Sequence, residues 1–217
     1  MNQEYLQTVL QSRLLSEVEV GDQGKAFNGL NVLKKKYNEG AMIFSEDEEI
    51  KMIGLVHCGL VRGEKPHLDG DIHLVYTYDK GEIFGLEGAA SIIQTAPMNY
   101  VAEEGTQVLM IPMDSLFQGE YKVDLITALV RILASDNVKK LYKIEMLAKR
   151  SLRQRVMVYL EILRKKAGTN SFTINMDREQ LAQYLCVNRS ALSYELNEMQ
   201  RDGLIRFKKN KFELVEK

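Results

Sequence analysis

Residues 177–217, DREQLAQYLCVNRSALSYELNEMQRDGLIRFKKNKFELVEK, decide which fold we expect for this chain. Asp177 is a good helix N-cap, and Gln180 follows three residues later, as a capping box requires. Asn188 is a favourable N-cap for a second helix after a short turn. Gly203 marks the end of that helix, because glycine adopts the left-handed conformation at little cost. The stretch therefore predicts two helices joined by a tight turn.

The apolar residues of this stretch support the same arrangement. The side chains expected on the inner faces of the two helices are Leu181, Ala182, Leu185, Leu192, Leu196 and Met199. Residues 204–207 and 211–215 then read as two short strands around the basic turn Lys208-Lys209-Asn210. A helix, a short turn, a second helix and a hairpin together make a winged helix-turn-helix.

Two groups of polar residues remain on the outside of this motif. One group lies at the amino end of the second helix, the end that enters the major groove in such motifs. The other group is the cluster of lysines on the wing, which suits contact with phosphates. We therefore predict double-stranded DNA as the partner, with an ordinary charged helical hairpin as the alternative. The expected contact residues are Asn188, Arg189, Ser190, Ser193, Tyr194, Lys208, Lys209 and Lys211.

The charge distribution agrees with a DNA-binding carboxyl-terminal part. The net charge of the 217 residues is −1, but residues 149–217 carry a net charge of +7 and residues 1–148 a net charge of −8. A basic part beside an acidic part indicates two domains with different partners, and a polyanion fits the basic one.

The residue pattern in the first half of the chain is typical of a β-rich domain. Between about residues 30 and 112, short runs of β-branched and aromatic residues alternate with turns, and residues 84–90 read as a loop that leads into a short helix. We predict a jelly-roll β-barrel, with a hairpin turn at Asp69-Gly70-Asp71. Residues 3–18 are expected to form one helix before it, with Leu6, Val9, Leu10 and Leu14 on one face. The other expected turns are Asn38-Glu39-Gly40, Cys58-Gly59, Asp79-Lys80-Gly81 and Glu104-Gly105.

From Met113 to about Lys149 the pattern becomes helical, with an apolar seam suited to packing on a partner helix. The same stripe could instead pack only on its own barrel. Another amphipathic helix follows from Leu152 and ends near Gly168. The predicted fold is thus α+β: a sensory barrel at 1–118, a dimerisation helix at 119–148 and a winged helix-turn-helix at 149–217. The seam consists of Ile126, Val130, Leu133, Asn137, Leu141 and Ile144.

Several other classes of protein find little support in the sequence. No amino-terminal signal peptide and no apolar run of about 20 residues is present, so we expect a soluble, cytoplasmic protein without a membrane partner. Cys58 and Cys186 are expected to be reduced and mostly buried. No CxxC, paired-histidine, GxSxG or P-loop motif occurs, so we predict neither a metal site nor an enzyme, and no cofactor.

Two parts of the chain resemble the Crp/Fnr family of regulators. The resemblance covers roughly residues 30 to 215 in the family's order. In the carboxyl-terminal part it involves residues 178–182, 188–193 and 203–205, which look like the family's helix-turn-helix. In the amino-terminal part it involves residues 37–44, 54–59 and 79–85, which are similar to strand and turn segments of the family's barrel.

This resemblance implies a cyclic-nucleotide-binding-type domain and a homodimer that reads a palindromic DNA site. By position, Arg189 corresponds to a family arginine that reads a base, and guanine is the favoured target of a bidentate arginine. Ser190 and Tyr194 stand where the family usually has Glu and Arg, so the usual half-site is not expected. RNA polymerase remains open as a further partner.

The resemblance also identifies a degenerate effector pocket. In cyclic-nucleotide binders of the family a Gly-Glu pair holds the ribose and an arginine holds the phosphate. Here Leu86 follows Gly85, and residues 96–101 contain no basic side chain. Because a buried phosphate without a cation is costly, we predict no tight binding of cyclic AMP. The pocket would take an unknown neutral or apolar effector, or none. Its expected lining is Gly85, Leu86, Glu87, Gly88, Ala89, Ala90, Met98, Asn99 and Tyr100.

Three alternatives stay open beside this reading. A cupin-like small-molecule-binding protein or enzyme with a helical appendage would show clustered histidines. A sensory adaptor would use its last helices for protein contacts instead of DNA. A haem ligand from His57 or His73, or a redox-sensing Cys58, would change what the first domain senses.

Overall fold

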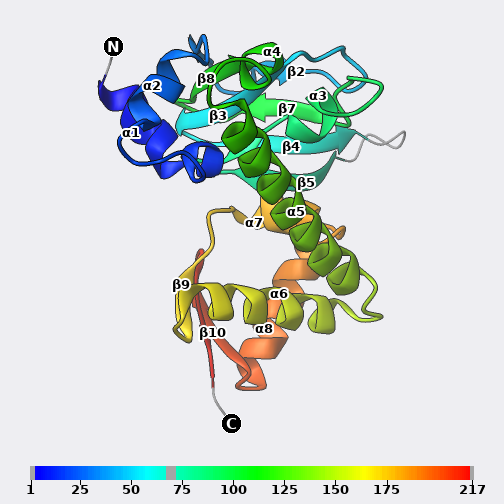
Figure 1. The fold of residues 1–217 in the computed structure, drawn as a ribbon. Coiled ribbons are helices and arrows are strands. Elements are labelled where there is room, and N and C mark those ends of the chain that lie inside the picture. Colours follow the sequence, from blue (N-terminus) through cyan, green and yellow to red (C-terminus); the bar gives the residue numbers. More distant parts are fainter. Residues whose placement is uncertain (1–2, 67–71, 216–217) are drawn as a thin grey trace. The chain divides into compact units, whose positions relative to one another are not determined.

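The computed structural model describes residues 3–66 and 72–215 and contains both helices and strands, as predicted (Figure 1). It divides into two compact units, residues Met1–Asn137 and Val138–Lys217, and the long helix α5 (Lys122–Leu147) contributes to both. Among the described residues, none of the helices has the length and apolar composition needed to cross a membrane. The division into 1–118, 119–148 and 149–217 stays a prediction.

The first unit is built on two four-stranded antiparallel sheets. Consecutive strands switch repeatedly between the two sheets, which is the arrangement of the predicted jelly roll. One sheet has the order β1 (Leu33–Lys36), β8 (Gln107–Pro112), β3 (Met52–Cys58), β6 (Ile83–Phe84). The other has the order β2 (Met42–Phe44), β7 (Asn99–Ala102), β4 (Val61–Pro66), β5 (Ile72–Tyr78).

The predicted turns connect these strands. Strands β4 and β5 pair in antiparallel register from Val61↔Tyr78 to Pro66↔Ile72, as the hairpin prediction requires. The predicted turn at Asp69-Gly70-Asp71 itself lies outside the described residues. The other four turns each contain a glycine with positive φ, namely Gly40, Gly59, Gly81 and Gly105.

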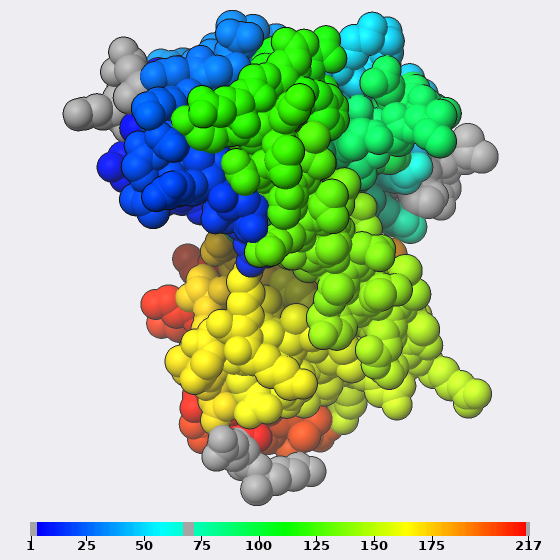
Figure 2. All heavy atoms as spheres, viewed as in Figure 1, coloured from blue at the N-terminus to red at the C-terminus, as the bar shows by residue number. Residues whose placement is uncertain are grey.

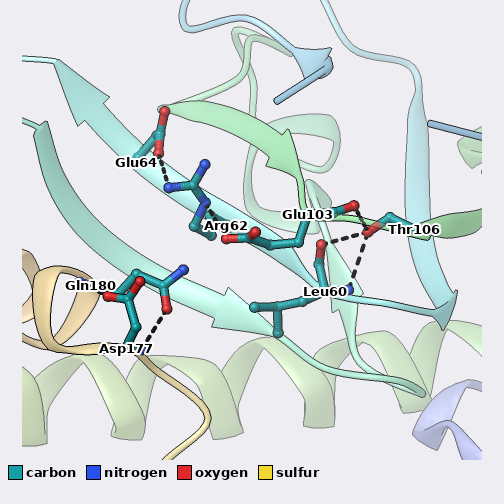
Figure 3. Close-up of polar contacts among 7 residues, drawn as sticks. All are labelled: Leu60, Arg62, Glu64, Glu103, Thr106, Asp177 and Gln180. Carbon is teal, nitrogen blue, oxygen red and sulfur yellow. Dashed lines mark hydrogen bonds and ion pairs between the residues drawn. The ribbon is translucent and has the colours of Figure 1, made fainter. Parts of the chain in front are cut away.

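The turn after β3 is fixed by a threonine from a distant part of the chain. The Thr106 hydroxyl donates to the Leu60 carbonyl (2.8 Å) and accepts from the Leu60 amide (3.2 Å), as Figure 3 shows. A Cβ on Gly59 would lie 2.6 Å from the Thr106 Cα, so only glycine fits here. Nearby, the Arg62 Nε lies 2.9 Å from Glu103 Oε1. These contacts fix the turn between β3 and β4 and tie β4 to the end of β7.

β1 is an edge strand of its sheet, since it pairs only with β8. All four of its residues are exposed, and three of them are consecutive lysines. Strand β3, between β8 and β6, has the opposite character: its five central residues are all buried. The core is therefore formed by the inner strands of this sheet and not by its edge strand β1.

Helices precede the sheets, but the prediction of one helix over residues 3–18 was wrong. The helix α1 (Gln3–Gln11) stops at Ser12, whose side chain accepts from the Leu14 amide and starts the 3₁₀ turn η1 (Arg13–Leu15). A further helix, α2 (Gln23–Asn28), was not predicted. Leu10 is exposed, whereas Val9 and Leu14 are buried, so the four predicted residues do not share one buried face.

His57 anchors α1 to strand β3. The ring is buried; its Nδ1 lies 2.7 Å from the Thr8 hydroxyl and its Nε2 lies 3.1 Å from Glu4 Oε1. Tyr5 packs edge-on against the imidazole. With both ring nitrogens engaged, His57 is unsuited to bind a haem iron in this arrangement.

The predicted continuous helical run from Met113 is broken. A short helix, α4 (Met113–Leu116), is separated from α5 by a segment in which Gly119 has a φ of +80°. Side chains of α5 lie on the surface in the view of Figure 2. The predicted seam is largely exposed on α5: Val130, Leu141 and Ile144 are 59%, 57% and 64% exposed. Leu133 differs, since it packs partly on the core of the first unit.

The second unit is a small helical domain with one three-stranded sheet. Its core holds all six residues predicted for the inner faces of the two helices, and these are buried. The helices are α6 (Leu152–Ala167), α7 (Arg178–Tyr184) and α8 (Arg189–Arg201). The sheet has the order β10 (Ile205–Lys208), β11 (Lys211–Leu214), β9 (Ser171–Thr173).

Candidate nucleic-acid interface

The helix-turn-helix begins at the predicted capping box. The Asp177 carboxylate accepts from the Gln180 amide (2.8 Å), and the Gln180 side chain accepts from the Asp177 amide (2.9 Å), as Figure 3 shows. Two amide donors of the first turn of α7 are thereby satisfied. The start of α7 is thus fixed by local sequence, as predicted.

The turn between α7 and α8 corrects the prediction for the cysteines. Cys186 is exposed and has a φ of +55°, and Cys58 is only half-buried. In the turn it is Val187 that packs on the core, and its amide donates to the Ala182 carbonyl (3.0 Å). Because Cys186 adopts the left-handed conformation, its side chain is turned away from that core.

Helix α8 presents the predicted contact residues at its amino end. The Asn188 Oδ1 accepts from the Ala191 amide (2.7 Å), which confirms the predicted N-cap. Arg189 and Ser190 are exposed, Ser193 is half-exposed and Tyr194 is 66% exposed. One end of α8 therefore displays the whole predicted set of reading residues to solvent.

An arginine of α6 holds α8 in place. Arg153 Nε lies 2.6 Å from Glu195 Oε1, and Arg153 Nη1 lies 2.5 Å from Asp202 Oδ2, so one guanidinium contacts the middle and the end of α8. Such a fork gives orientation as well as attraction. No local pattern indicates this contact, since its partners are more than 40 positions away.

The wing is a tight hairpin that carries the three predicted lysines. Lys208 pairs with Lys211 in the β10–β11 register, and the turn between them has Lys209 at a φ of +55°. All three lysines are exposed. A lysine in the left-handed region costs about 1–2 kcal/mol, so the surrounding contacts must hold this conformation.

Arg178, at the start of α7, supplies one of those contacts. Its Nη2 donates to the Lys209 carbonyl (3.1 Å), and its guanidinium carbon lies 5.2 Å and 5.6 Å from the ring centres of Phe207 and Phe212. On the other side of the turn, Asn210 exchanges backbone and side-chain hydrogen bonds with Ile174. Arg178 was not predicted as a site residue; it joins the helix-turn-helix to the wing.

Arg178 links the basic residues of the two helices with those of the wing. Burial, and in second place the positive charge of Arg189, lowers the pKa of Arg178 from its ordinary value. Arg178 therefore lies close enough to Arg189 for repulsion, and it also touches the wing at Lys209. A polyanion placed here would relieve that repulsion.

The residues predicted for the effector pocket also come together, in the first unit. Gly85 has a φ of +77° and starts the short helix α3 (Leu86–Ala89). Leu86, Met98 and Tyr100 are buried, whereas Ala90 is exposed. A Cβ on Gly88 would lie 2.4 Å from the Thr95 carbonyl oxygen, which shows how closely α3 packs on the chain before β7.

Four aromatic rings pack against one another near α3. Tyr100 and Phe84 are both fully buried, with their ring centres 5.4 Å apart, and Phe44 and Tyr78 pack against both. The Tyr78 hydroxyl donates to Glu87 at a long 3.5 Å. Burial, and then the Glu87 charge, raises the pKa of Tyr78 and of Tyr100, so both phenols stay neutral. Glu87 and Tyr100 belong to the predicted lining, whereas Tyr78 was not predicted as a site residue.

Two family models match this chain. A model of the Crp-like helix-turn-helix domain matches residues 154–216, and a model of the cyclic nucleotide-binding domain matches residues 34–119. Together they cover well over half of the 217 residues. The chain belongs to the Crp/Fnr family. It is a transcription regulator with a helix-turn-helix DNA-binding domain, and the family is one of regulators and not of enzymes.

The proteins compared with this chain are similar to it in fold but distant in sequence. The Electron transport regulator A of Shewanella oneidensis is 22% identical over 181 residues, which is 81% of this chain and 72% of that protein. The structure of FixK2 from Bradyrhizobium japonicum is similar with a TM-score of 0.70 at 19% identity, covering 86% of this chain and 94% of that one. The c-di-GMP-responsive regulator CLP of Xanthomonas campestris gives 0.72 at 17% identity, covering 89% and 100%. Identities this low support the fold alone.

Proposed function

We propose that the regulator binds a palindromic DNA operator as a homodimer, with α8 in the major groove and the wing on the phosphate backbone. The observation that carries this proposal is the amino end of α8, where Arg189 stands exposed beside a basic wing. Two-fold protein symmetry would match half-sites about one helical turn apart. A regulator of chromosomal DNA would act in the cytoplasm.

The exposed stripe of α5 supports the homodimer. Val130, Leu141 and Ile144 are each more than half exposed, and Asn137 is an exposed polar residue between them. Apolar residues spaced three and four apart favour the packing of two identical helices, and a polar residue within such a seam fixes the register. Size-exclusion chromatography with light scattering should give twice the chain mass; a monomer at micromolar concentration would contradict the proposal.

For the first unit we propose a pocket that does not bind cyclic AMP tightly. Residues 96–101 have no basic side chain to balance a phosphate. The buried rings of Phe84 and Tyr100 pack against each other near α3, with their centres 5.4 Å apart. An effector, if one acts here, would be neutral or apolar. Calorimetric titration with cyclic AMP should show no binding in the micromolar range, and micromolar affinity would overturn this part of the proposal.

The DNA proposal is tested by titrating the full chain against fluorescent genomic fragments. Wild-type protein should select specific fragments, and Arg189→Ala should lose about 10²-fold or more in specific affinity, since each bidentate arginine–guanine contact contributes about 1–3 kcal/mol. Its affinity for non-specific duplex should change little, because that affinity depends mainly on phosphates. Equal loss on both kinds of duplex would contradict base reading by Arg189.

A pair of matched lysine variants tests the wing. Lys208→Ala/Lys209→Ala should reduce the salt dependence of binding by about 0.9 in the logarithmic slope for each lysine that neutralises a phosphate. Lys165→Ala/Lys166→Ala, which removes the same charge from the exposed last turn of α6, is the control and should leave the slope unchanged. Equal slopes for both variants would exclude phosphate contact by the wing lysines.

RNA polymerase stays a proposed partner, tested by co-binding on a promoter fragment.

A further inference from the structure

Tyr194 stands out on the reading surface because it is a large aromatic side chain left in water. It is 66% exposed on α8, whereas Leu192, Leu196 and Met199 of the same helix are buried. Within the described residues it has no hydrogen-bond or ring partner. Burying such a ring against an apolar group releases about 25 cal/mol per Å² of covered area, so the ring favours a partner with apolar surface.

The neighbour one turn earlier leaves room for this ring. Ser190 and Tyr194 are four residues apart and share a face of α8. The Ser190 hydroxyl donates to Asn188 Oδ1 (2.8 Å), so this short side chain is tied to the helix cap. Long helical side chains lean toward the amino end of their helix. The ring of Tyr194 is therefore the largest neutral surface at the end of α8 that bears Arg189.

The major groove offers one apolar group for such a surface. Base edges there present hydrogen-bond donors and acceptors, and thymine alone adds a methyl group. A neutral aromatic ring matches a methyl group and matches a phosphate poorly, since phosphate contacts favour cations and donors. The tyrosine hydroxyl is the part of the side chain that a phosphate would attract.

We propose that Tyr194 reads the 5-methyl group of a thymine in each half-site, next to the base read by Arg189. This inference rests on the proposed binding of α8 in the major groove. It assigns to Tyr194 a base specificity that depends on an apolar contact. The family usually has a charged arginine at this position. The binding site should therefore contain a thymine whose methyl group matters for affinity.

The test removes that methyl group and nothing else. Once a preferred duplex has been selected with the full chain, each thymidine is replaced in turn by deoxyuridine, symmetrically in both half-sites. Wild-type protein should bind about fourfold more weakly per half-site at one position, since a buried methyl group contributes about 0.8 kcal/mol. Replacement of flanking thymidines outside the half-sites is the control and should have no effect.

Two protein variants assign the effect to the ring. Tyr194→Phe should keep the preference for thymidine over deoxyuridine, and Tyr194→Ala should lose it. The proposal is overturned if wild-type protein binds every deoxyuridine duplex as tightly as the parent, or if Tyr194→Phe loses the preference as Tyr194→Ala does. Absence of any specific duplex for wild-type protein would instead refute the DNA-binding function itself.

Discussion

Two tyrosines show how differently the two units use the same side chain. Tyr194 in the second unit is 66% exposed at the end of α8, whereas Tyr100 in the first unit is fully buried among aromatic rings. The reading surface is thus left open for a partner. The rings beside α3 pack against one another instead. The difference teaches that the same side chain is exposed where we propose a partner and buried where it packs within its own unit.

The sharpest way to test this comparison is to truncate both tyrosines. Tyr100→Ala should destabilise the first unit by about 3–5 kcal/mol, because it leaves a cavity in a packed core. Tyr194→Ala should change stability by no more than about 0.5 kcal/mol, as expected of an exposed position. Thermal unfolding followed by circular dichroism measures both. A small effect of Tyr100→Ala would show that the interior tolerates a void and has room for a ligand.

The next largest effect is expected on the exposed stripe of α5. Leu141→Asp/Ile144→Asp places two charges per chain in the proposed dimer contact, so the protein should become monomeric at micromolar concentration. The control is Tyr142→Asp, since Tyr142 is 52% exposed but lies outside the seam. Light scattering measures the mass, and a dimer that survives the double change would place the contact elsewhere.

A smaller effect is expected where Arg178 holds the wing. Arg178→Lys keeps the charge but loses the planar contact with Phe207 and Phe212, so the wing should loosen by about 1 kcal/mol. Amide hydrogen exchange should accelerate at residues 208–211, and specific DNA affinity should fall about fivefold. Arg206→Lys, at an exposed ion pair with Glu213, is the matched control. Equal exchange rates in both variants would show that Arg178 does not stabilise the wing.

The last effect is a pH dependence in the stability of the second unit. Burial lowers the pKa of Lys143 to about 8, although its ammonium lies 3.8 Å from the ring centre of Tyr184. The unfolded chain, with an ordinary pKa near 10.4, binds more protons between these two values. Stability should therefore rise as pH increases from about 8 toward 10. Lys143→Met should remove this rise in the free energy of unfolding, as denaturant unfolding at pH 7.5 and 9.5 would show. The same rise in both proteins would exclude Lys143 as its source.

What the sequence could predict was mainly local. The caps at Asp177 and Asn188 and the stop at Gly203 act within one helical turn, and all three formed as predicted. The same holds for the turn glycines, whose conformation depends on their own residue. The winged helix-turn-helix followed because such local features succeeded one another at the required spacing.

What the sequence could not predict involves residues that are far apart along the chain. Arg153 contacts α8 across more than 40 positions, and Thr106 holds the Leu60 turn across 46. The exposure of Cys186 also escaped prediction, because composition favours burial of a free cysteine while the left-handed turn there prevents it. Long-range packing decided the contacts of Arg153 and Thr106, and no short pattern encodes such contacts.

The edge strand β1 has a consequence for two copies held side by side. A strand with an unpaired edge invites another chain to add to the sheet, which leads to aggregation. Three consecutive exposed lysines on β1 oppose such stacking by mutual repulsion. The regulator can therefore reach high local concentration on DNA while its sheets remain separate. Replacing those lysines with neutral residues should favour edge-to-edge aggregation, without touching either the proposed operator contacts or the interior.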